Sequence, residues 1–567
     1  MSLSEVRDIL KQIEDRLTAV DLGNPVVEQA VKDLLNLVEH LVASQHDLLQ
    51  EVLRLKEQLE QKKKAKTTAK QNGDNDGGDQ KRGADHSSEK RRRKRQTPKP
   101  IPASDRRSFK KLTVHEEIEC PVEPDQLPPD ACRLGNESVV TQDIEIKPRN
   151  IRFQRHVYYS PSRKKYYRGP LPSGYGRSDF GPDLRALILS LKYCGNMSEP
   201  KIREFLENFD VSISAGSLSN ILTATAQSFE NEFHDLLMAG LASTPYQQTD
   251  DTSARVCGQA WHTHILCNPF YTAYFTRPNK DRLTVLAVLQ NVESPRFRFN
   301  IDTLALLRKK LKVPVKWQLR VAALGEDVEF DATSLKPLLD SWLGEGRESQ
   351  TRTCIEQAAA IVYYQQQTAV PVVETLVCDD AGQFKLITDQ LALCWIHAGR
   401  HYERLSPVVT RHAEALDKFA ERYWDYYALL QRYCGNPISA DADRLRLEFD
   451  ELFSTRTGYA ALDDRIAKTA AKRDELLTVL LHPEVPLHNN ASELGARVSA
   501  RRRDVSLHSR SVRGARAMDI FTTIVQTSKK LGISAYRFLR DRLSHHLEMP
   551  SLSACIQNAS QNLNASR

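Results

Sequence analysis

The pattern that most constrains the fold is a set of strand-like runs placed among helical sequence between residues 246 and 396. The first three runs are rich in β-branched and aromatic residues and are separated by breaks that contain Gly or Pro: Tyr246 to Val256, Trp261 to Leu266 and Phe270 to Phe275. They predict a three-stranded meander. Helical sequence follows to about Gln366, and then come two very apolar runs: Val372 to Cys378 and Leu391 to Ile396. Strands embedded among helices after a meander predict an α/β core with a mixed sheet.

The size and composition of the chain are those of a soluble globular protein with several domains. It has 567 residues, of which 40% are hydrophobic and 27% charged, enough for roughly three to five domains. No apolar run approaches the roughly 18 residues of a membrane span, and the N-terminus lacks the basic and apolar parts of a secretory signal. The ten cysteines contain no Cys-x-x-Cys pair and are expected to be reduced. We therefore expect no membrane partner and a cytoplasmic location.

Residues 1–60 are predicted to be helical and to contain a short coiled-coil seam. Leucines recur every seven residues, with a second, mostly valine, set between them: Leu34, Leu41, Leu48 and Leu55, then Val31, Val38, Val52 and Leu59. Four heptads predict a homo-oligomer formed through residues 31–59. The alternative is a single amphipathic helix that packs on its own domain.

The net charge of +7 is concentrated in residues 61–110, which carry +11, so the rest of the chain carries −4. We expect residues 61–111 to be a disordered basic linker, because they have no hydrophobic periodicity to build a core. A run of cations in it is suited to bind phosphates: Lys90, Arg91, Arg92, Arg93, Lys94 and Arg95. The alternative is a solvated tether without a binding role.

Residues 112–180 are rich in short β-like runs, such as Val139 to Ile146 and Ile151 to Tyr159, and predict a small β-rich domain. Residues 181–244 predict three helices with short connections: Asp183 to Tyr193, Ser198 to Asn208, and Ala215 through Leu222. This spacing suits a helix-turn-helix that reads DNA. Helical triplets are also common in α domains of other functions.

The remaining divisions follow from the same patterns. The predicted core comprises residues 245–277, 371–404 and 486–525. Two helical insertions, 278–370 and 405–485, interrupt it, and a C-terminal helical segment and tail occupy 526–567.

Three carboxylates stand where an α/β core gathers side chains at one edge of its sheet. Asp250 lies in the first strand of the meander, Asp379 follows the first of the two apolar runs, and Glu493 lies near the start of a helix. Such a set can hold two Mg²⁺ (or Mn²⁺) ions about 4 Å apart for phosphoryl transfer. The alternative is that each is an ordinary strand-end or capping acid.

Basic and metal-ligating residue types flank these carboxylates. Arg497 and Arg501 repeat at helical spacing after Glu493, and Arg502 and Arg503 extend a cluster suited to DNA phosphates. The alternative is a solvated helix face. Cys394 and His397 have metal-ligand types, but no complete zinc set is evident, so a structural role is favoured.

Four segments together resemble the insertion sequence 66 family of transposases, in the family's order: QTDDT at 248–252, VCDDAGQF at 377–384, CWIHAGR at 394–400 and HNNASELGAR at 488–497. The C-terminal AYRFLRDRL at 535–543 is also similar. The resemblance implies an RNase H-like catalytic core, with Asp250, Asp379 and Glu493 as the catalytic, metal-holding triad. Asp251 and Asp380 are second choices.

The sequence also departs from the family pattern. Where the family has a four-cysteine element, this chain has Cys120 and Cys132, so no zinc is expected there. His488 and Leu494 replace an Asp and an Arg beside the third carboxylate, and 129 residues separate the first two carboxylates, which implies an insertion.

The resemblance implies a DNA transposase that cleaves and transfers strands at the inverted repeats of its own element in a prokaryotic cytoplasm, near the nucleoid. Its partners would be double-stranded DNA, at the element ends and the target, and element-encoded accessory proteins. The departures support an alternative, a catalytically inactive or domesticated DNA-binding protein. A third hypothesis is a structure-specific nuclease on the same core.

Overall fold

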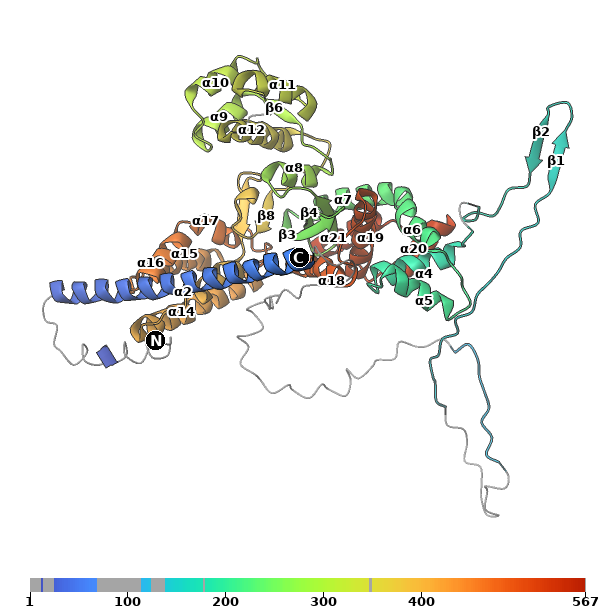
Figure 1. Cartoon of the computed structure of the whole chain (residues 1–567), viewed down its shortest axis with the longest axis horizontal. Coiled ribbons are helices and arrows are strands. Elements are labelled where there is room, and N and C mark those ends of the chain that lie inside the picture. The colour runs from blue at the N-terminus through green and yellow to red at the C-terminus, as the bar shows by residue number, and fades with distance from the viewer. Residues whose placement is uncertain are drawn as a thin grey trace.

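A computed structural model describes residues 12–13, 25–68, 114–123, 138–176, 179–345 and 349–565. At its centre is a five-stranded mixed sheet in the order β5-β4-β3-β8-β9 (Figure 1). Its strands are β3 (Tyr246–Val256), β4 (Gln259–Cys267), β5 (Thr272–Arg277), β8 (Thr375–Cys378) and β9 (Gln390–Leu393). The meander β3-β4-β5 is antiparallel, and β8 and β9 run parallel to β3 and to each other. The expected α/β class with a mixed sheet is confirmed.

The free edge of β5 is covered by a helix instead of a sixth strand. Side chains four residues apart on α19 (Val512–Lys530) accept hydrogen bonds from alternate backbone N–H groups of β5. The pairs are Asp519 with Thr276 at 2.7 Å, Thr523 with Tyr274 at 3.0 Å and Thr527 with Thr272 at 3.2 Å. This satisfies donors that an exposed edge would offer to another chain.

The helical triplet has the predicted positions: α4 (Pro182–Tyr193), α5 (Glu199–Glu207) and α6 (Ala215–Ala224). The Ser214 hydroxyl caps α6 by accepting from the Ser217 N–H at 3.0 Å. The triplet leads through η3 (Thr225–Phe229) and α7 (Glu230–Ala242) into β3. The same hydrophobic core includes α4, α7, α19 and the last helices, α20 (Ala535–Ser544) and α21 (Leu552–Ala565).

The segment between β5 and β8 is mostly helical, as expected, but also contains a small antiparallel sheet that the sequence did not predict. Its elements are α8 (Arg282–Gln290), β6 (Phe297–Phe299), α9 (Ile301–Lys309), α10 (Val315–Ala322), β7 (Val328–Phe330), α11 (Ala332–Leu343) and α12 (Gln350–Gln366). Strands of three residues fall below what a period-two pattern can reveal.

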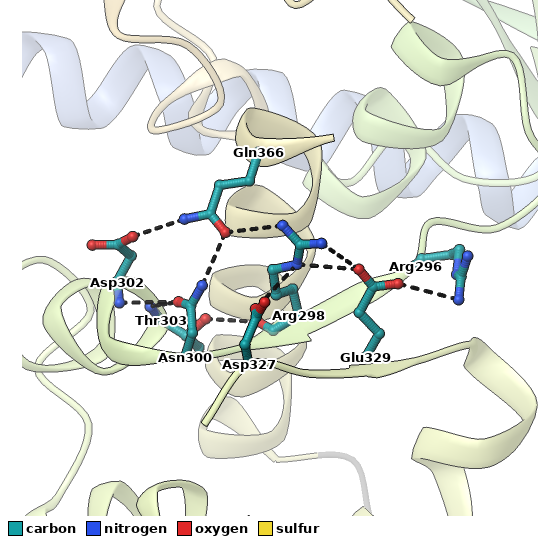
Figure 2. Close-up of polar contacts among 8 residues, drawn as sticks. All are labelled: Arg296, Arg298, Asn300, Asp302, Thr303, Asp327, Glu329 and Gln366. Atoms are coloured by element: carbon teal, nitrogen blue, oxygen red, sulfur yellow. Dashed lines mark hydrogen bonds and ion pairs between the residues drawn. The ribbon is translucent and has the colours of Figure 1, made fainter. Parts of the chain in front are cut away.

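A polar network closes this segment on itself. Figure 2 shows Arg298 at its centre, donating to Gln366 on α12 at 3.2 Å and pairing with Glu329 on β7. Asn300 Nδ2 also donates to Gln366, at 2.9 Å, and Asp302 accepts from it at 2.7 Å. The network joins β6 and the start of α9 to β7 and to the end of α12.

The helical block after β9 begins earlier than expected. A strand through Ile396 was predicted, but β9 ends at Leu393, and Trp395 and Ile396 lie in the first turn of α13 (Trp395–Glu403). Both side chains are buried, so their apolar character reflects the core and not a strand. The rest of the block is α14 (Thr410–Gly435), α15 (Ser439–Phe453), α16 (Ala460–Ala470), α17 (Arg473–Leu476) and η5 (Thr478–Leu480).

The long N-terminal helix α2 (Pro25–Thr68) extends past the predicted boundary at residue 60. One side of it packs on the protein's own chain: Leu35 joins Val408 and Val409 in a small apolar cluster, with Val31, Val38 and Val42 against it. Glu39 accepts from the N–H groups of Val408 and Val409 and pairs with His412. The leucines at positions 34, 41, 48 and 55 are more than half exposed.

The prediction of a small β-rich domain at 112–180 is wrong for the described residues there. Residues 138–150 form no strand, and the regular structure is one hairpin, β1 (Val157–Ser160) with β2 (Lys165–Arg168). The apolar side chains Val139 and Ile144 are exposed, so β-like composition here has no second layer to pack against. Within the described residues, every helix is too short or too polar to cross a membrane.

Candidate functional site

Asp250 and Asp379 are brought together by the pairing of β3 with β8. These strands are parallel, and Gln248 pairs with Val377. If this register is continued by two residues, Asp250 lies opposite Asp379. Asp379 is the residue just after the end of β8. The insertion between the two strands therefore separates these carboxylates in sequence but not in space.

Glu493 reaches the same place from α18 (Asn490–Ser506), which is held close against the sheet. Asn489, 1% exposed at the N-terminus of this helix, donates from Nδ2 to the Thr249 carbonyl at 2.6 Å. Two residues after Glu493, an added Cβ on Gly495 would lie 2.8 Å from Ile265 Cγ2 of β4. The glycine allows the close approach, and Asn489 sets the position of the helix along β3.

Burial and neighbouring charges shift the pKa values of Asp250 and Asp379. Burial, and then the negative charges of Asp379, Asp251 and Glu493, raise the pKa of Asp250 to about 7, against a hydrogen bond from the Asp251 N–H. Burial also raises the pKa of Asp379, although the Ala381 N–H and His397 oppose it. The site thus concentrates negative charge where little water can screen it.

Glu493 contacts several basic side chains. Arg400 of α13 donates to its Oε2 at 3.2 Å, and Arg497 lies 3.9 Å from the same oxygen. His397 Nε2 lies 3.7 Å from Oε1 and 3.0 Å from Arg400 Nη1. Because a guanidinium can only donate, Nε2 can accept in that contact only when the ring is neutral.

The neighbouring carboxylates, Asp251 and Asp380, have lysine partners instead. Asp251 pairs with Lys280 at 3.5 Å and accepts from Gln383 at 3.1 Å. Asp380 pairs with Lys385 at 3.1 Å and also contacts Lys472. Burial acts to raise the pKa of Asp380, but these lysines hold it below its ordinary value.

The structure brings Cys394 and His397 together with Glu493. One ligand atom from each lies within 4.8 Å of the others. Cys394 is buried, which raises the pKa of its thiol to about 11, and Sγ accepts from the Asn489 N–H at 3.3 Å. Its thiol therefore supports the start of α18, while the Arg400 guanidinium supplies positive charge beside the other two residues.

The basic residues after Glu493 differ in their surroundings. Arg501 is exposed, and Arg503 donates to the Thr252 hydroxyl at 3.2 Å. Arg502 does not fit the expected phosphate contact: it is 7% exposed and donates to the Thr522 hydroxyl at 2.6 Å. It lies on the side of α18 that faces α19, which the run of arginines in the sequence did not reveal. Arg91, Arg92, Arg93, Lys94 and Arg95 lie outside the described residues.

Two contacts of the site were not predicted from the sequence. Arg400 and Asn489 both lie in the motifs that carried the resemblance, but their roles depend on contacts across long sequence separations. Arg400 is 93 residues from Glu493 and Asn489 is 240 residues from Thr249. Their positions within the motifs were the signal that could have identified them.

Comparisons with known proteins agree with this geometry. The sequence model of the transposase IS66 family matches residues 177–295 and 358–517, which include all three carboxylates. An uncharacterized protein, y4jO, of Sinorhizobium fredii (strain NBRC 101917 / NGR234) is 32% identical over 310 residues, which are 54% of this chain and 94% of that protein. The family match is interrupted at the insertion that carries β6 and β7. The chain thus belongs to the IS66 family of transposases.

Proposed function

We propose that this transposase is a metal-dependent enzyme that cleaves DNA at the terminal inverted repeats of its own insertion sequence and transfers the strands to a target. The observation that carries the proposal is the register that sets Asp250 beside Asp379, with Glu493 on the helix packed across β3. The strand order, an antiparallel meander extended by two parallel strands, supports an RNase H-like core. The division of the chain into this core, two helical insertions and their flanking segments is part of the proposal.

The oxygen donors of this site fit Mg²⁺ or Mn²⁺. Both are hard cations that prefer carboxylates, and the buried Oε1 of Glu493 accepts no hydrogen bond from the described residues. Asp250 would contact two ions, Asp379 one and Glu493 the other. Two ions in such a site supply charge stabilisation to both the attacking and the leaving oxygen of an in-line displacement.

The chain's own residues position the DNA strand and balance charge. Arg497 and Arg501 lie on the face of α18 that continues from Glu493, where a phosphate of the bound strand would lie. Arg400 holds the Glu493 carboxylate in place through the bond to Oε2. No group of the protein needs to form a covalent intermediate, since positioning and electrostatics supply the catalysis.

The test is cleavage of a duplex that carries the element's inverted repeats, in Mg²⁺ with purified protein. We expect nicking and strand transfer by the parent, and loss of both to background in Asp379→Asn. Asp380→Asn is the matched control, because Asp380 is paired with Lys385 and Lys472 and should keep most of the activity. Equal losses in both variants, or full activity in Asp379→Asn, would refute the assignment.

The other outcomes distinguish the alternatives. A parent protein that binds DNA but neither cuts nor joins it would be an inactive or domesticated DNA-binding protein. Cutting of branched DNA without strand transfer would indicate a structure-specific nuclease.

The setting of the reaction is part of the same proposal. We place it in the cytoplasm of a prokaryote, at the nucleoid, with double-stranded DNA at the element ends and target and with accessory proteins encoded by the element. The helical triplet α4 to α6 would contribute to DNA binding. Two copies of the chain would associate through the exposed leucines of α2.

A further inference from the structure

The hairpin of β1 and β2 stands away from the rest of the protein (Figure 1). Its strands pair with each other in a separate two-stranded sheet, and all of their residues except Ser160 are exposed. At its base, Phe153 and Tyr175 pack with ring centroids 5.0 Å apart. There the chain lies so close to α20 that an added Cβ on Gly174 would be 2.9 Å from the Ser544 Cα. The hairpin is thus anchored at one end and free at the other.

The hairpin presents tyrosines on both of its faces. Tyr158 pairs across the strands with Tyr167, and Tyr159 with Tyr166, and successive pairs alternate between faces. All four side chains are at least 40% exposed. Cross-strand aromatic pairs stabilise a ribbon, but folding alone does not explain large aromatic groups left in water on both sides.

The charge around these tyrosines has one sign. Residues 147–178 contain nine Lys and Arg residues and no Asp or Glu. Arg163, Lys164 and Lys165 form the free end of the hairpin. Two cations lie over the tyrosine rings: Lys165 Nζ is 5.8 Å from the Tyr167 ring centroid, and Arg168 is 5.6 Å from that of Tyr166. Cations and aromatic faces placed together in this way suit a polyanion that also has planar groups.

We propose that the β1–β2 hairpin is a ribbon that binds duplex DNA in its major groove. A B-DNA major groove, about 12 Å wide, admits a two-stranded ribbon. Arg163, Lys164 and Lys165 contact phosphates, and the tyrosines contact sugars and base edges. The proposal rests on DNA as the substrate, and adds a contact region outside the triad, the helical triplet and the arginines of α18.

The test measures binding of a short labelled duplex to the full-length protein by fluorescence anisotropy, in EDTA and over a series of salt concentrations. The variant carries Arg163→Gln, Lys164→Gln and Lys165→Gln. We expect affinity to fall by at least about tenfold, and the slope of log K against log salt to decrease by about 0.9 for each phosphate that the variant no longer neutralises. A second variant, Tyr158→Ala with Tyr167→Ala, should weaken binding with a smaller change in slope.

The matched control changes three exposed lysines of the insertion, Lys309→Gln, Lys310→Gln and Lys312→Gln, and so removes the same charge elsewhere. Unchanged duplex affinity in the hairpin variant, or an equal loss in the control, would overturn the proposal. So would a loss confined to single-stranded DNA, which would make the hairpin a stacking surface for single strands. The thermal midpoint should not change in the control or in the variant of Arg163, Lys164 and Lys165, because the substituted side chains are exposed.

The same measurements separate this proposal from the proposed activity. Binding is measured in EDTA, so it does not depend on the metal-dependent cleavage. A parent that binds through the hairpin but does not cut DNA would contradict the activity and leave the hairpin assignment standing. A hairpin variant that binds and cuts as the parent does would contradict the hairpin assignment alone.

Discussion

Asn489 links the helix of the third carboxylate to the strand of the first. Its side chain is buried and donates to the carbonyl of Thr249, the residue before Asp250. A hydrogen bond in this place has two effects, because it stabilises the fold and fixes where Glu493 lies relative to Asp250. The second effect is specific to this position on α18.

We expect Asn489→Ala to lower the free energy of unfolding by about 1–3 kcal/mol, the usual cost of removing one partner of a buried hydrogen bond. Strand cleavage should fall by more than this loss of stability explains, because Glu493 is no longer fixed against β3. Denaturant unfolding and a cleavage assay well below the thermal midpoint measure the two effects. Leu494→Ala, at an exposed position of the same helix, should change neither the stability nor the cleavage rate. Full activity in Asn489→Ala would show that the hydrogen bond to Thr249 is not needed for cleavage.

Asp519 gives a pH-dependent contribution to stability. Burial raises its pKa from 3.8 to about 6, against hydrogen bonds from Thr276. Because the folded state favours the protonated form, this stability is present at low pH and is lost as pH rises from about 4 to about 6. The full change is at most about 3 kcal/mol.

Asp519→Asn removes this titration and keeps the hydrogen bonds, since an amide can accept from the Thr276 N–H and donate to its hydroxyl. The variant should therefore become more stable relative to the parent as pH rises across that window. Urea unfolding at several pH values measures the difference. A difference that stays constant with pH would show that Asp519 is ionised throughout.

At the scale of single elements, the packing of α18 on β4 depends on one glycine. Gly495 lies against Ile265, and its carbonyl accepts from the Tyr274 hydroxyl at 3.2 Å. Alanine is normally the better helix former by about 1 kcal/mol. Here its methyl group would push the helix from the sheet.

We expect Gly495→Ala to destabilise the protein by about 1–3 kcal/mol, as overpacked cores do, and to reduce cleavage by displacing Glu493. Gly435→Ala is the control, because nothing lies within 4 Å of a Cβ at that position of α14, and it should be neutral or slightly stabilising. Thermal melts and cleavage rates compare the pair. Equal behaviour of the two variants would show that α18 can shift without loss.

Elements with a strong pattern of their own could be predicted from the sequence. The meander, the triplet of helices and the strand before Asp379 all appear close to their expected positions, because their turns and apolar periodicity are local. Asp250 lies within β3 and Asp379 just past β8, so their proximity depends on the parallel register of these two strands, which is a tertiary contact. The choice between Asp379 and Asp380 depends on Lys472, which is 92 residues away.

Other features depend on what lies beside them. Trp395 and Ile396 are as apolar as the residues of a buried strand, but they lie in a helix. Arg502 is buried under α19, a position that no sequence pattern predicts. The strands β6 and β7 are too short to produce a recognisable pattern. In the described part of residues 112–180, Val139 and Ile144 are exposed to solvent and not packed against a second layer. Each of these is a tertiary effect that outweighs local preference.

At the scale of the whole molecule, α2 uses different sides for different contacts. Leu35 and Val38 face the chain's own cluster at Val408, whereas Leu34, Leu41, Leu48 and Leu55 are exposed. The two interpretations of this helix, docking on its own chain and pairing with a second copy, are therefore compatible. Packing on the chain accounts for Val31 and Val38 of the predicted seam, and the four leucines remain exposed.

We expect Leu41→Asp with Leu48→Asp to convert the assembled protein to a monomer, because charges in a coiled-coil seam cannot be buried unpaired. Sedimentation equilibrium measures the mass. Ala43→Asp with Gln50→Asp adds the same charge to the same helix, at exposed positions away from the leucines, and should leave the mass unchanged. A monomeric parent, or an unaltered mass in the leucine variant, would contradict the assignment.

The three hydrogen bonds between α19 and β5 match the spacing of a helix to that of a strand over a short length only. Four residues of helix rise about 6.0 Å, whereas two residues of strand rise about 6.8 Å. Each further pair of helix side chain and strand N–H would therefore be offset by about another 0.8 Å. The next positions along the helix, Ala515 and Leu531, carry no acceptor side chain. Beyond these three hydrogen bonds, Pro278 has no N–H and the Phe270 N–H donates to Asn268 Oδ1 at 2.9 Å, so the neighbouring positions of the chain need no acceptor from α19.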